Sequence, residues 1–266
     1  MDRGLGISAF LIIVCITLCI TCYYFVFSGP AEDWPKIIFQ TWKSKTDIPK
    51  NMRYWSETWK SKHPDYKYVL WDDADNRAFV KEHFSWFLPT YDAYDVEIKR
   101  ADAIRYMFLY KYGGIYVDMD FECLKPLDDL LEENLRYDIL LGSIESSSNL
   151  WHLSNSIPNA IMISKPANQF WIRLLEEMMS VAESKAQRKG RVEEETGPVV
   201  LKEVYDNSWF SNIRVLPPNV LYPISWITDG KKRQESLEAD DLTSLTQSMK
   251  ITYPSSYAVT YWTHSW

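Results

Sequence analysis

Two carboxylates spaced two positions apart, Asp118 and Asp120, are the side chains of this sequence best suited to chemistry. Asp118 lies in the segment 115–119, where an apolar run predicts a strand, and Asp120 is the residue that follows this segment. Alternate side chains of a strand face the same way, so we expect both carboxylates on one side and Met119 on the other. Such a pair suits a hard divalent ion, Mn²⁺ or Mg²⁺, which prefers oxygen ligands. The ion could bridge two phosphates and stabilise the charge on a departing nucleoside diphosphate.

The triplet Asp-x-Asp alone is weak evidence for a metal site, because a chain of this composition contains about one such triplet by chance. A second triplet, Asp73-Ala74-Asp75, serves as an internal comparison. It opens a polar segment, so we interpret its acids as a solvated helix N-terminus. The first triplet differs because Gly113-Gly114 and an apolar strand precede it.

The helix predicted over 95–112 carries Asp102 and Arg105 among apolar residues. Their spacing is that of a local ion pair. Charges on a nearly all-apolar helix are also costly unless a fixed partner needs them. A ribose hydroxyl pair for Asp102 and a phosphate or sugar oxygen for Arg105 would be such partners. Both interpretations stay open.

The elements around these residues alternate between strand and helix, which predicts an α/β sandwich around a mostly parallel sheet. The predicted strands cover 35–41, 66–71, 115–119, 137–143 and 159–164, and the predicted helices cover 51–63, 72–84, 95–112 and 168–189. In an open sheet of this kind, ligands bind beyond the carboxyl ends of the strands. The polar stretch 229–250 is predicted to be an exposed loop or variable insert.

The aromatic segment 257–266 is too apolar to be left in water, so we expect it to pack as a strand beside Asp118 and Asp120. Two carboxylates leave a six-coordinate ion dependent on further ligands. We therefore expect His264 or Ser265 to complete the metal and diphosphate shell.

Two other positions each allow a binding and a structural interpretation. Gly197 precedes Pro198 at a helix start, where backbone amides could face a substrate or where the helix simply begins. Asn159 precedes an apolar strand and could hydrogen-bond a sugar or form a turn.

The N-terminus contains an uncharged run, Leu5–Phe27, of roughly 34 Å as a helix, which is enough to span a bilayer. The length of this run and the aromatic residues at its C-terminal end favour an uncleaved anchor over a cleaved signal peptide. We therefore predict a cytoplasmic tail at 1–4, the anchor at 5–27, a stem at 28–34 and a lumenal body at 35–266. The net charge of −7 and pI near 5.2 argue against a nucleic-acid partner.

Several of these motifs together resemble the DXD-containing sugar transferases of glycosyltransferase family 32, above all the fungal inositol phosphoceramide mannosyltransferases. The motifs are PKIIFQTW (35–42), YKYVLWDD (66–73), the segment 99–128, NAIMIS (159–164), TGP (196–198) and the final SW. The resemblance implies a GT-A (Rossmann-like) fold, a type II Golgi anchor, a Mn²⁺-dependent nucleotide-sugar donor and retention of anomeric configuration. It also implies roles for residues: Asp118 and Asp120 as the catalytic metal motif, Asp102 and Arg105 as a donor clamp, and Gln40, Thr41 and Trp42 along the nucleotide.

The sequence departs from the family at Phe39 and Thr260, where its members usually carry histidines. The leading hypothesis is a retaining transferase that moves a hexose, expected to be mannose from GDP-mannose, onto a glycolipid or glycan such as inositol phosphoceramide. The alternative, which Thr260 favours, is a catalytically silent member that is a partner subunit or regulator of another transferase.

Overall fold

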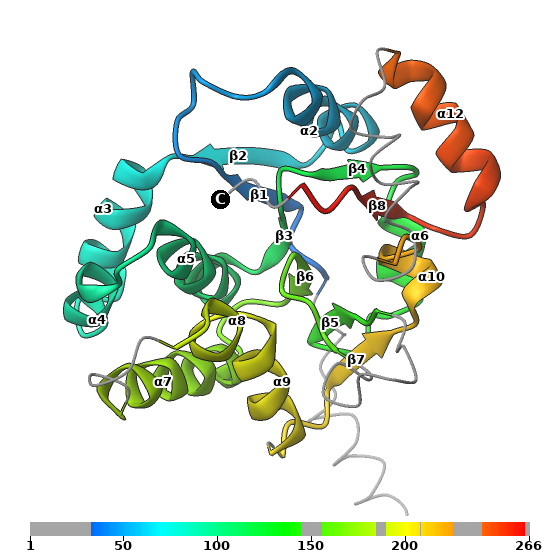
Figure 1. The fold of residues 1–266 in the computed structure, drawn as a ribbon. Coiled ribbons are helices and arrows are strands. Elements are labelled where there is room, and N and C mark those ends of the chain that lie inside the picture. Colours follow the sequence, from blue (N-terminus) through cyan, green and yellow to red (C-terminus); the bar gives the residue numbers. More distant parts are fainter. Residues whose placement is uncertain (1–32, 145–155, 185–189, 208, 226–240, 264–266) are drawn as a thin grey trace, which may run out of the picture. The chain divides into compact units, whose positions relative to one another are not determined.

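The computed structural model describes residues 33–144, 156–184, 190–207, 209–225 and 241–263, nearly all within the compact unit Trp34–Trp266. Its centre is a six-stranded sheet in the order β2-β1-β3-β6-β5-β7 (Figure 1). The strands are β1 (Ile37–Thr41), β2 (Lys67–Trp71), β3 (Gly114–Val117), β5 (Ile139–Gly142), β6 (Ile161–Ser164) and β7 (Ile213–Leu216). Three of the pairings are parallel, and only β6 runs antiparallel to its two neighbours. The expectation of a mixed, mostly parallel sheet is confirmed.

Each face of the sheet has its own core, because neighbouring residues of a strand point to opposite sides. Phe39, Tyr116 and Leu141 pack on one face. That face is covered by α3 (Asp73–His83), α4 (Leu88–Ala93), α5 (Glu97–Tyr112), α7 (Gln169–Ser184) and α9 (Pro198–Asp206), with the short α8 (Val192–Glu195) between them (Figure 1). These helices therefore bury this face of the strands that lead to Asp118.

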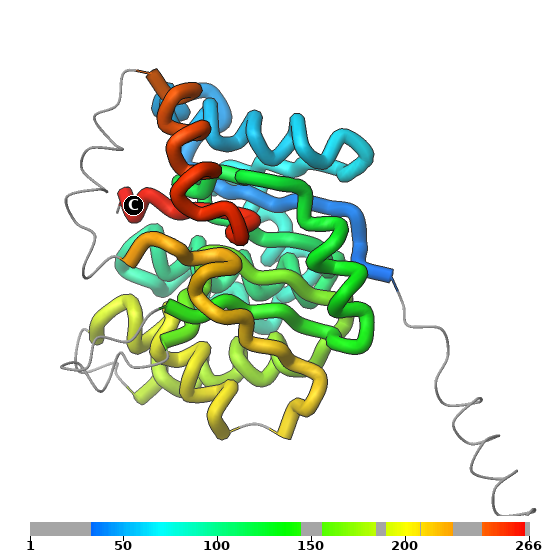
Figure 2. The backbone as a smooth tube through the Cα atoms, turned by 90° about the vertical axis from the view of Figure 1, so that its right-hand side faces the viewer, coloured from blue at the N-terminus to red at the C-terminus, as the bar shows by residue number. Residues whose placement is uncertain are grey.

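The opposite face packs against α2 (Lys50–Lys62), α6 (Asp128–Glu132) and α10 (Pro218–Leu221). Beside it lies a two-stranded antiparallel sheet of β4 (Phe121–Cys123) and β8 (Ala258–Thr260). Figure 2 shows α12 (Leu242–Thr252) at the same end of the fold as α2, and the two helices share a third core of buried residues with β8. The prediction that the C-terminal segment packs as a strand next to Asp118 and Asp120 is confirmed for Ala258–Thr260, since Thr260 lies opposite Phe121, whereas residues 261–263 are not part of the strand and 264–266 lie outside the described residues.

The junction between α5 and β3 depends on two glycines with positive φ angles, Gly113 at 64° and Gly114 at 88°. A Cβ atom on Gly114 would lie 2.5 Å from the carbonyl oxygen of Ile37 in the neighbouring strand β1. Only glycine combines this backbone conformation with so close an approach. The glycine pair therefore aims β3 directly into the sheet next to β1.

Two sequence predictions are wrong in part. The strand predicted over 115–119 ends at Val117, and residues 118–120 form a turn closed by a bond from the Phe121 amide to the Asp118 carbonyl, at 3.2 Å. Within the polar stretch 229–250, the described part from 242 is helical, because Asp241 caps α12 and the helix buries Thr246 and Met249 on one face.

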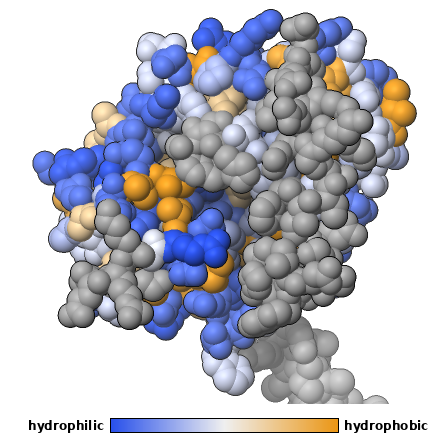
Figure 3. Space-filling view, in the orientation of Figure 1, coloured by the Kyte–Doolittle hydropathy of each residue, from blue (hydrophilic) through white to orange (hydrophobic). Residues whose placement is uncertain are grey.

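The predicted membrane anchor at 5–27 lies outside the described residues, and none of the helices in the described part is both long and apolar enough to cross a bilayer. Figure 3 shows a largely hydrophilic face over the described helices, with apolar groups in separate places. Within the described ranges, the large apolar side chains that are exposed are Trp86, Val96, Tyr112, Trp209, Phe210 and Ile251.

Candidate active site

Asp118 lies just beyond the carboxyl end of β3 and is held from three directions. The Tyr116 hydroxyl donates to its carboxylate at 2.7 Å, and Arg105 Nη1 lies 3.1 Å from Oδ1. The Gln40 amide, from the end of β1, donates to its backbone oxygen at 3.1 Å. Because β1 and β3 are parallel neighbours, their carboxyl ends meet at one edge of the sheet, where ligands bind in open α/β folds.

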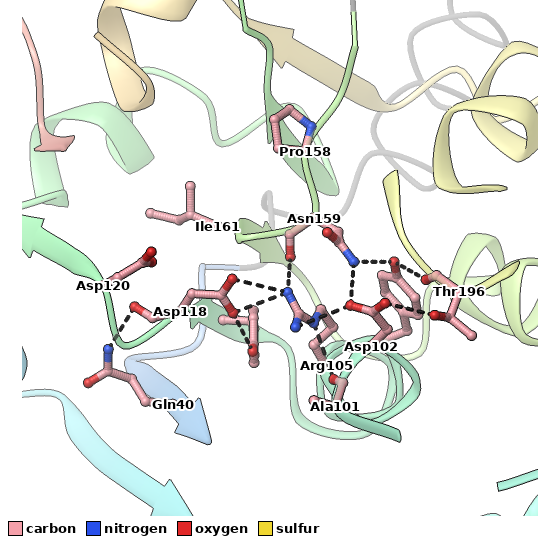
Figure 4. A network of polar contacts seen from close by, with 12 residues as sticks. Gln40, Ala101, Asp102, Arg105, Asp118, Asp120, Pro158, Asn159, Ile161 and Thr196 are labelled. Carbon is pink, nitrogen blue, oxygen red and sulfur yellow. Dashed lines mark hydrogen bonds and ion pairs between the residues drawn. The ribbon is translucent and has the colours of Figure 1, made fainter. Parts of the chain in front are cut away.

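Arg105 lies between Asp102 and Asp118, as Figure 4 shows. Its Nη2 is 3.2 Å from Asp102 Oδ1, and its Nη1 donates to the Asn159 carbonyl at 2.9 Å. The local ion pair on α5 therefore exists, but it is part of a longer network that reaches the Asp-x-Asp turn. Both side chains of the pair are only 4% exposed.

Asp102 is surrounded by protein donors. The Thr196 hydroxyl donates to Oδ2 at 2.7 Å and the Asn159 amide donates to Oδ1 at 2.8 Å. The same amide also donates to the Tyr106 hydroxyl at 2.8 Å. A direct contact between Asp102 and a ribose would break this network, so the geometry favours a positioning role for both Asp102 and Asn159.

Asp120 has a different environment from Asp118. The backbone amide of Thr263 donates to its Oδ2 at 2.9 Å, and the Thr263 hydroxyl lies 3.3 Å away. Among the described residues it has no ion-pair partner, whereas Asp118 has Arg105. Burial, and then repulsion from Asp118, raise the pKa of Asp120 to about 6. Burial also raises the pKa of Asp118, against the opposing charge of Arg105.

The charges of this cluster fit a divalent cation. Among the described residues, Arg105 is the one cation paired with this cluster, and it pairs with Asp102 and Asp118 but not with Asp120, so the three carboxylates carry two uncompensated negative charges when all are ionised. Buried charge of this kind is unfavourable without a counter-ion. Asp118 and Asp120 supply the hard oxygen ligands that Mn²⁺ or Mg²⁺ takes. The described residues contain no group of three or more His, Cys, Asp or Glu side chains that could hold a metal. The predicted ligands His264 and Ser265 lie outside the described residues.

The residues predicted along the nucleotide, Gln40, Thr41 and Trp42, follow one another at the end of β1. Gln40 is fully buried and joins the Tyr68 hydroxyl, at 2.6 Å, to the backbone of Asp118. Thr41 donates to a carbonyl at the end of β2 at 3.1 Å. Trp42 is partly exposed, and its indole nitrogen donates to the Asp47 carbonyl at 2.8 Å. Gln40 and Thr41 thus hold the ends of β1 and β2 and the Asp118 backbone together. The partly exposed ring of Trp42 lies at the same edge of the sheet.

The backbone amide of Gly197 itself is bonded within the protein, and the binding interpretation of this helix start stays a prediction. The amide donates to the Val192 carbonyl at 3.0 Å, which closes the turn between α8 and α9. A Cβ atom at this position would lie 2.9 Å from the Cα of Glu193. The glycine is required by this close approach, and it places the preceding Thr196 against Asp102.

The second triplet, Asp73-Ala74-Asp75, begins a helix as predicted. The Asp72 side chain accepts from the amides of Ala74 and Asp75, and the Asp75 side chain accepts from the Asp72 amide, which together form a capping box. Of the residues that complete the site network, sequence reasoning missed Tyr116 and Thr196. The first lies two positions before Asp118 and the second lies in the TGP motif.

Comparison with known proteins agrees with this geometry. Residues 49–137 match the family model described as "Glycosyltransferase sugar-binding region containing DXD motif". An inositol phosphoceramide mannosyltransferase of Schizosaccharomyces pombe is 47% identical over 97 residues, which cover 36% of this chain and 28% of that protein. A mannosyl phosphorylinositol ceramide synthase of Saccharomyces cerevisiae is 38% identical over 144 residues, or 54% of this chain and 34% of that protein.

Among solved structures, the PaToxG glycosyltransferase is similar with a TM-score of 0.50 at 17% identity, over 88% of this chain and 92% of that one. The fold is therefore the GT-A-like glycosyltransferase fold. The aligned segment spans only about a third of the length of the curated relatives. Residues 49–137 are thus similar to the sugar-binding region of DXD-containing glycosyltransferases, and the predicted resemblance to fungal inositol phosphoceramide mannosyltransferases is confirmed.

Proposed function

We propose that this protein is a metal-dependent, retaining mannosyltransferase that takes mannose from GDP-mannose. The proposed acceptor is inositol phosphoceramide or a related glycolipid or glycan. The observation that carries the proposal is Asp120, a buried carboxylate without a cationic partner in the described residues, beside the Arg105–Asp118 pair at the edge where β1 and β3 end. The names of the similar fungal proteins support the choice of sugar and acceptor.

In this proposal Asp118 and Asp120 hold a divalent ion, Mn²⁺ or Mg²⁺, with His264 or Ser265 as further ligands. A bound ion would neutralise the charge that develops on the nucleoside diphosphate as it leaves. Arg105 and Gln40 keep Asp118 in place through its carboxylate and its backbone oxygen. The partly exposed Trp42 provides a ring for the nucleotide.

A catalytically silent family member that is a partner or regulator of another transferase is the second candidate. Thr260 favours it, because its hydroxyl accepts from the Trp262 amide at 3.2 Å and the residue is 1% exposed. Such a side chain cannot replace a metal-binding histidine without rearrangement of the tail.

Hydrolysis of GDP-mannose with added Mn²⁺ separates the two candidates. We expect the unsubstituted protein to release GDP only with a divalent ion. Asp120→Asn should lower the rate by at least about a hundredfold, because the loss of groups that only support a metal ligand already costs about ten- to a hundredfold. Asp73→Asn, in the other triplet, should keep the original rate. Tight GDP binding without any hydrolysis would favour the silent member, and equal losses in both variants would contradict a metal site at Asp120.

A further inference from the structure

Glu122 is a buried carboxylate two residues after Asp120 that the proposed chemistry does not use. It lies in β4 with 0% exposure. The Tyr261 hydroxyl donates to its Oε2 at 2.5 Å, and the Thr246 hydroxyl of α12 donates to its Oε1. Burying a carboxylate is unfavourable unless donors satisfy it. Both of its oxygens are satisfied from distant parts of the chain, so Glu122 acts on the protein and not on a ligand.

Tyr261 is the residue through which Glu122 reaches the site. Its ring is fully buried and stacks on Trp55, with centroids 4.4 Å apart and planes at 16°. Its backbone amide donates to the Asp120 carbonyl at 3.1 Å. Tyr261 is therefore held at both ends, by Glu122 through its hydroxyl and by the Asp120 backbone through its amide.

The chain beyond Tyr261 bends sharply. Trp262 has a φ angle of 49°, in the left-handed region that bulky residues rarely occupy. Such a conformation persists only when surrounding contacts enforce it. Trp262 donates its indole N–H to the Ile224 carbonyl at 2.9 Å and stacks on Tyr222. After this bend, the Thr263 amide reaches the Asp120 carboxylate.

We propose that Glu122 is a positioning residue for the tail 261–263. By holding the Tyr261 hydroxyl it fixes the bend at Trp262, and by that bend it places the Thr263 amide on the Asp120 carboxylate. The last step, from a positioned Asp120 to tighter metal binding, rests on the proposed function. The first steps concern the tail alone and can be tested without metal.

Hydrogen exchange of the full-length, chelator-treated protein tests the positioning of the tail. Tyr261→Phe keeps the ring on Trp55 and removes only the hydroxyl that Glu122 accepts from, and Glu122→Gln weakens the same contact from the other side. In each variant we expect the amides of the segment 258–263 to exchange at least about tenfold faster, with those of β3 unchanged. Tyr257→Phe is the matched control: that ring lies below Lys125, with the ammonium 4.0 Å from its centroid, and should leave exchange unchanged.

Calorimetric titration with Mn²⁺ alone tests the last step. Both variants should bind the ion about ten- to a hundredfold more weakly, as happens when groups supporting a metal ligand are removed. The double variant should be little worse than either single one, because the two changes break one contact.

Unchanged tail exchange in both variants would overturn the proposal, and so would a rise that includes β3, since that would mean general destabilisation. If the unsubstituted protein binds no Mn²⁺, the proposed metal role of Asp120 fails. The exchange rates would still decide whether Glu122 holds the tail.

Discussion

The carboxylate of Asp120 is held in a place that disfavours its charge. Its pKa rises from 3.8 to about 6, mainly through burial and then through Asp118. Below about pH 3 the group is protonated in both the folded and the unfolded chain and has no effect on stability. As the pH rises from 3.8 to about 6, the unfolded chain ionises this group while the folded protein keeps it protonated, so stability is lost across this range and the loss is complete above about pH 6.

Asp120→Asn should therefore stabilise the metal-free protein at pH 7.5 by up to about 3 kcal/mol, from a shift of roughly two pKa units. At about pH 3, below both pKa values, the gain should vanish. Urea denaturation with a chelator, at both pH values, measures the difference. A gain of equal size at both would mean that the charge of Asp120 is not the cause.

Arg105 serves acceptors on four residues, Asp102, Asp118, Asn159 and Ala101, with one planar group. A lysine carries a point charge on a flexible stem and cannot reproduce this fork. Arg105→Lys should lower the free energy of unfolding by about 1–3 kcal/mol, because buried acceptors lose their donors.

Arg77→Lys provides the comparison. Arg77 also makes two bonds to one carboxylate, that of Asp92, at 2.8 and 2.7 Å, but its side chain is 54% exposed. Exposed pairs contribute little, so this variant should stay within about 0.5 kcal/mol of the unsubstituted protein. Equal losses in the two lysine variants would show that burial does not set the importance of Arg105.

The helices and strands that could be predicted from the sequence are those determined by residues close to one another in the chain. The apolar helix α5, its glycine end and the strand after it follow from residues within about twenty positions. The turn at 118–120 could not be predicted that way, because Met119 extends the apolar run while the pairing that defines β4 comes from β8, far along the chain. For the same reason Asp102 and Arg105 could be singled out but Thr196 could not, since its contact to Asp102 crosses 94 residues.

Gly114 offers a test of the junction that aims β3 at the site. Gly114→Ala should destabilise the protein by at least about 2 kcal/mol, because its φ angle of 88° and the nearby Ile37 carbonyl both exclude a Cβ atom. Thermal and urea denaturation measure the loss. Where alanine suits the backbone, the same substitution stabilises by about 0.4–1 kcal/mol. A neutral or stabilising result would contradict the strain inferred at this position.

For the molecule as a whole, the uncharged run Leu5–Phe27 bears on where the proposed reaction occurs. We predict that the full-length protein stays in the membrane pellet after alkaline carbonate extraction and that its body is protected from protease in sealed microsomes. Recovery of a mature chain that starts near Ala31 would show instead that the run is a cleaved signal. Protection in Golgi-derived vesicles would support the proposed lumenal location.

The bond between the Thr263 amide and Asp120 joins residues 143 positions apart. During translation, at about 5–20 residues per second, the Asp-x-Asp turn leaves the ribosome roughly seven to thirty seconds before the segment that completes its surroundings. Strands β1, β3, β5 and β6 all emerge before the tail does, so most of the sheet can form before Asp120 acquires this contact. Asp120 therefore lacks this contact until the tail has been made, and under the proposed function the turn should become able to hold a metal only after that point.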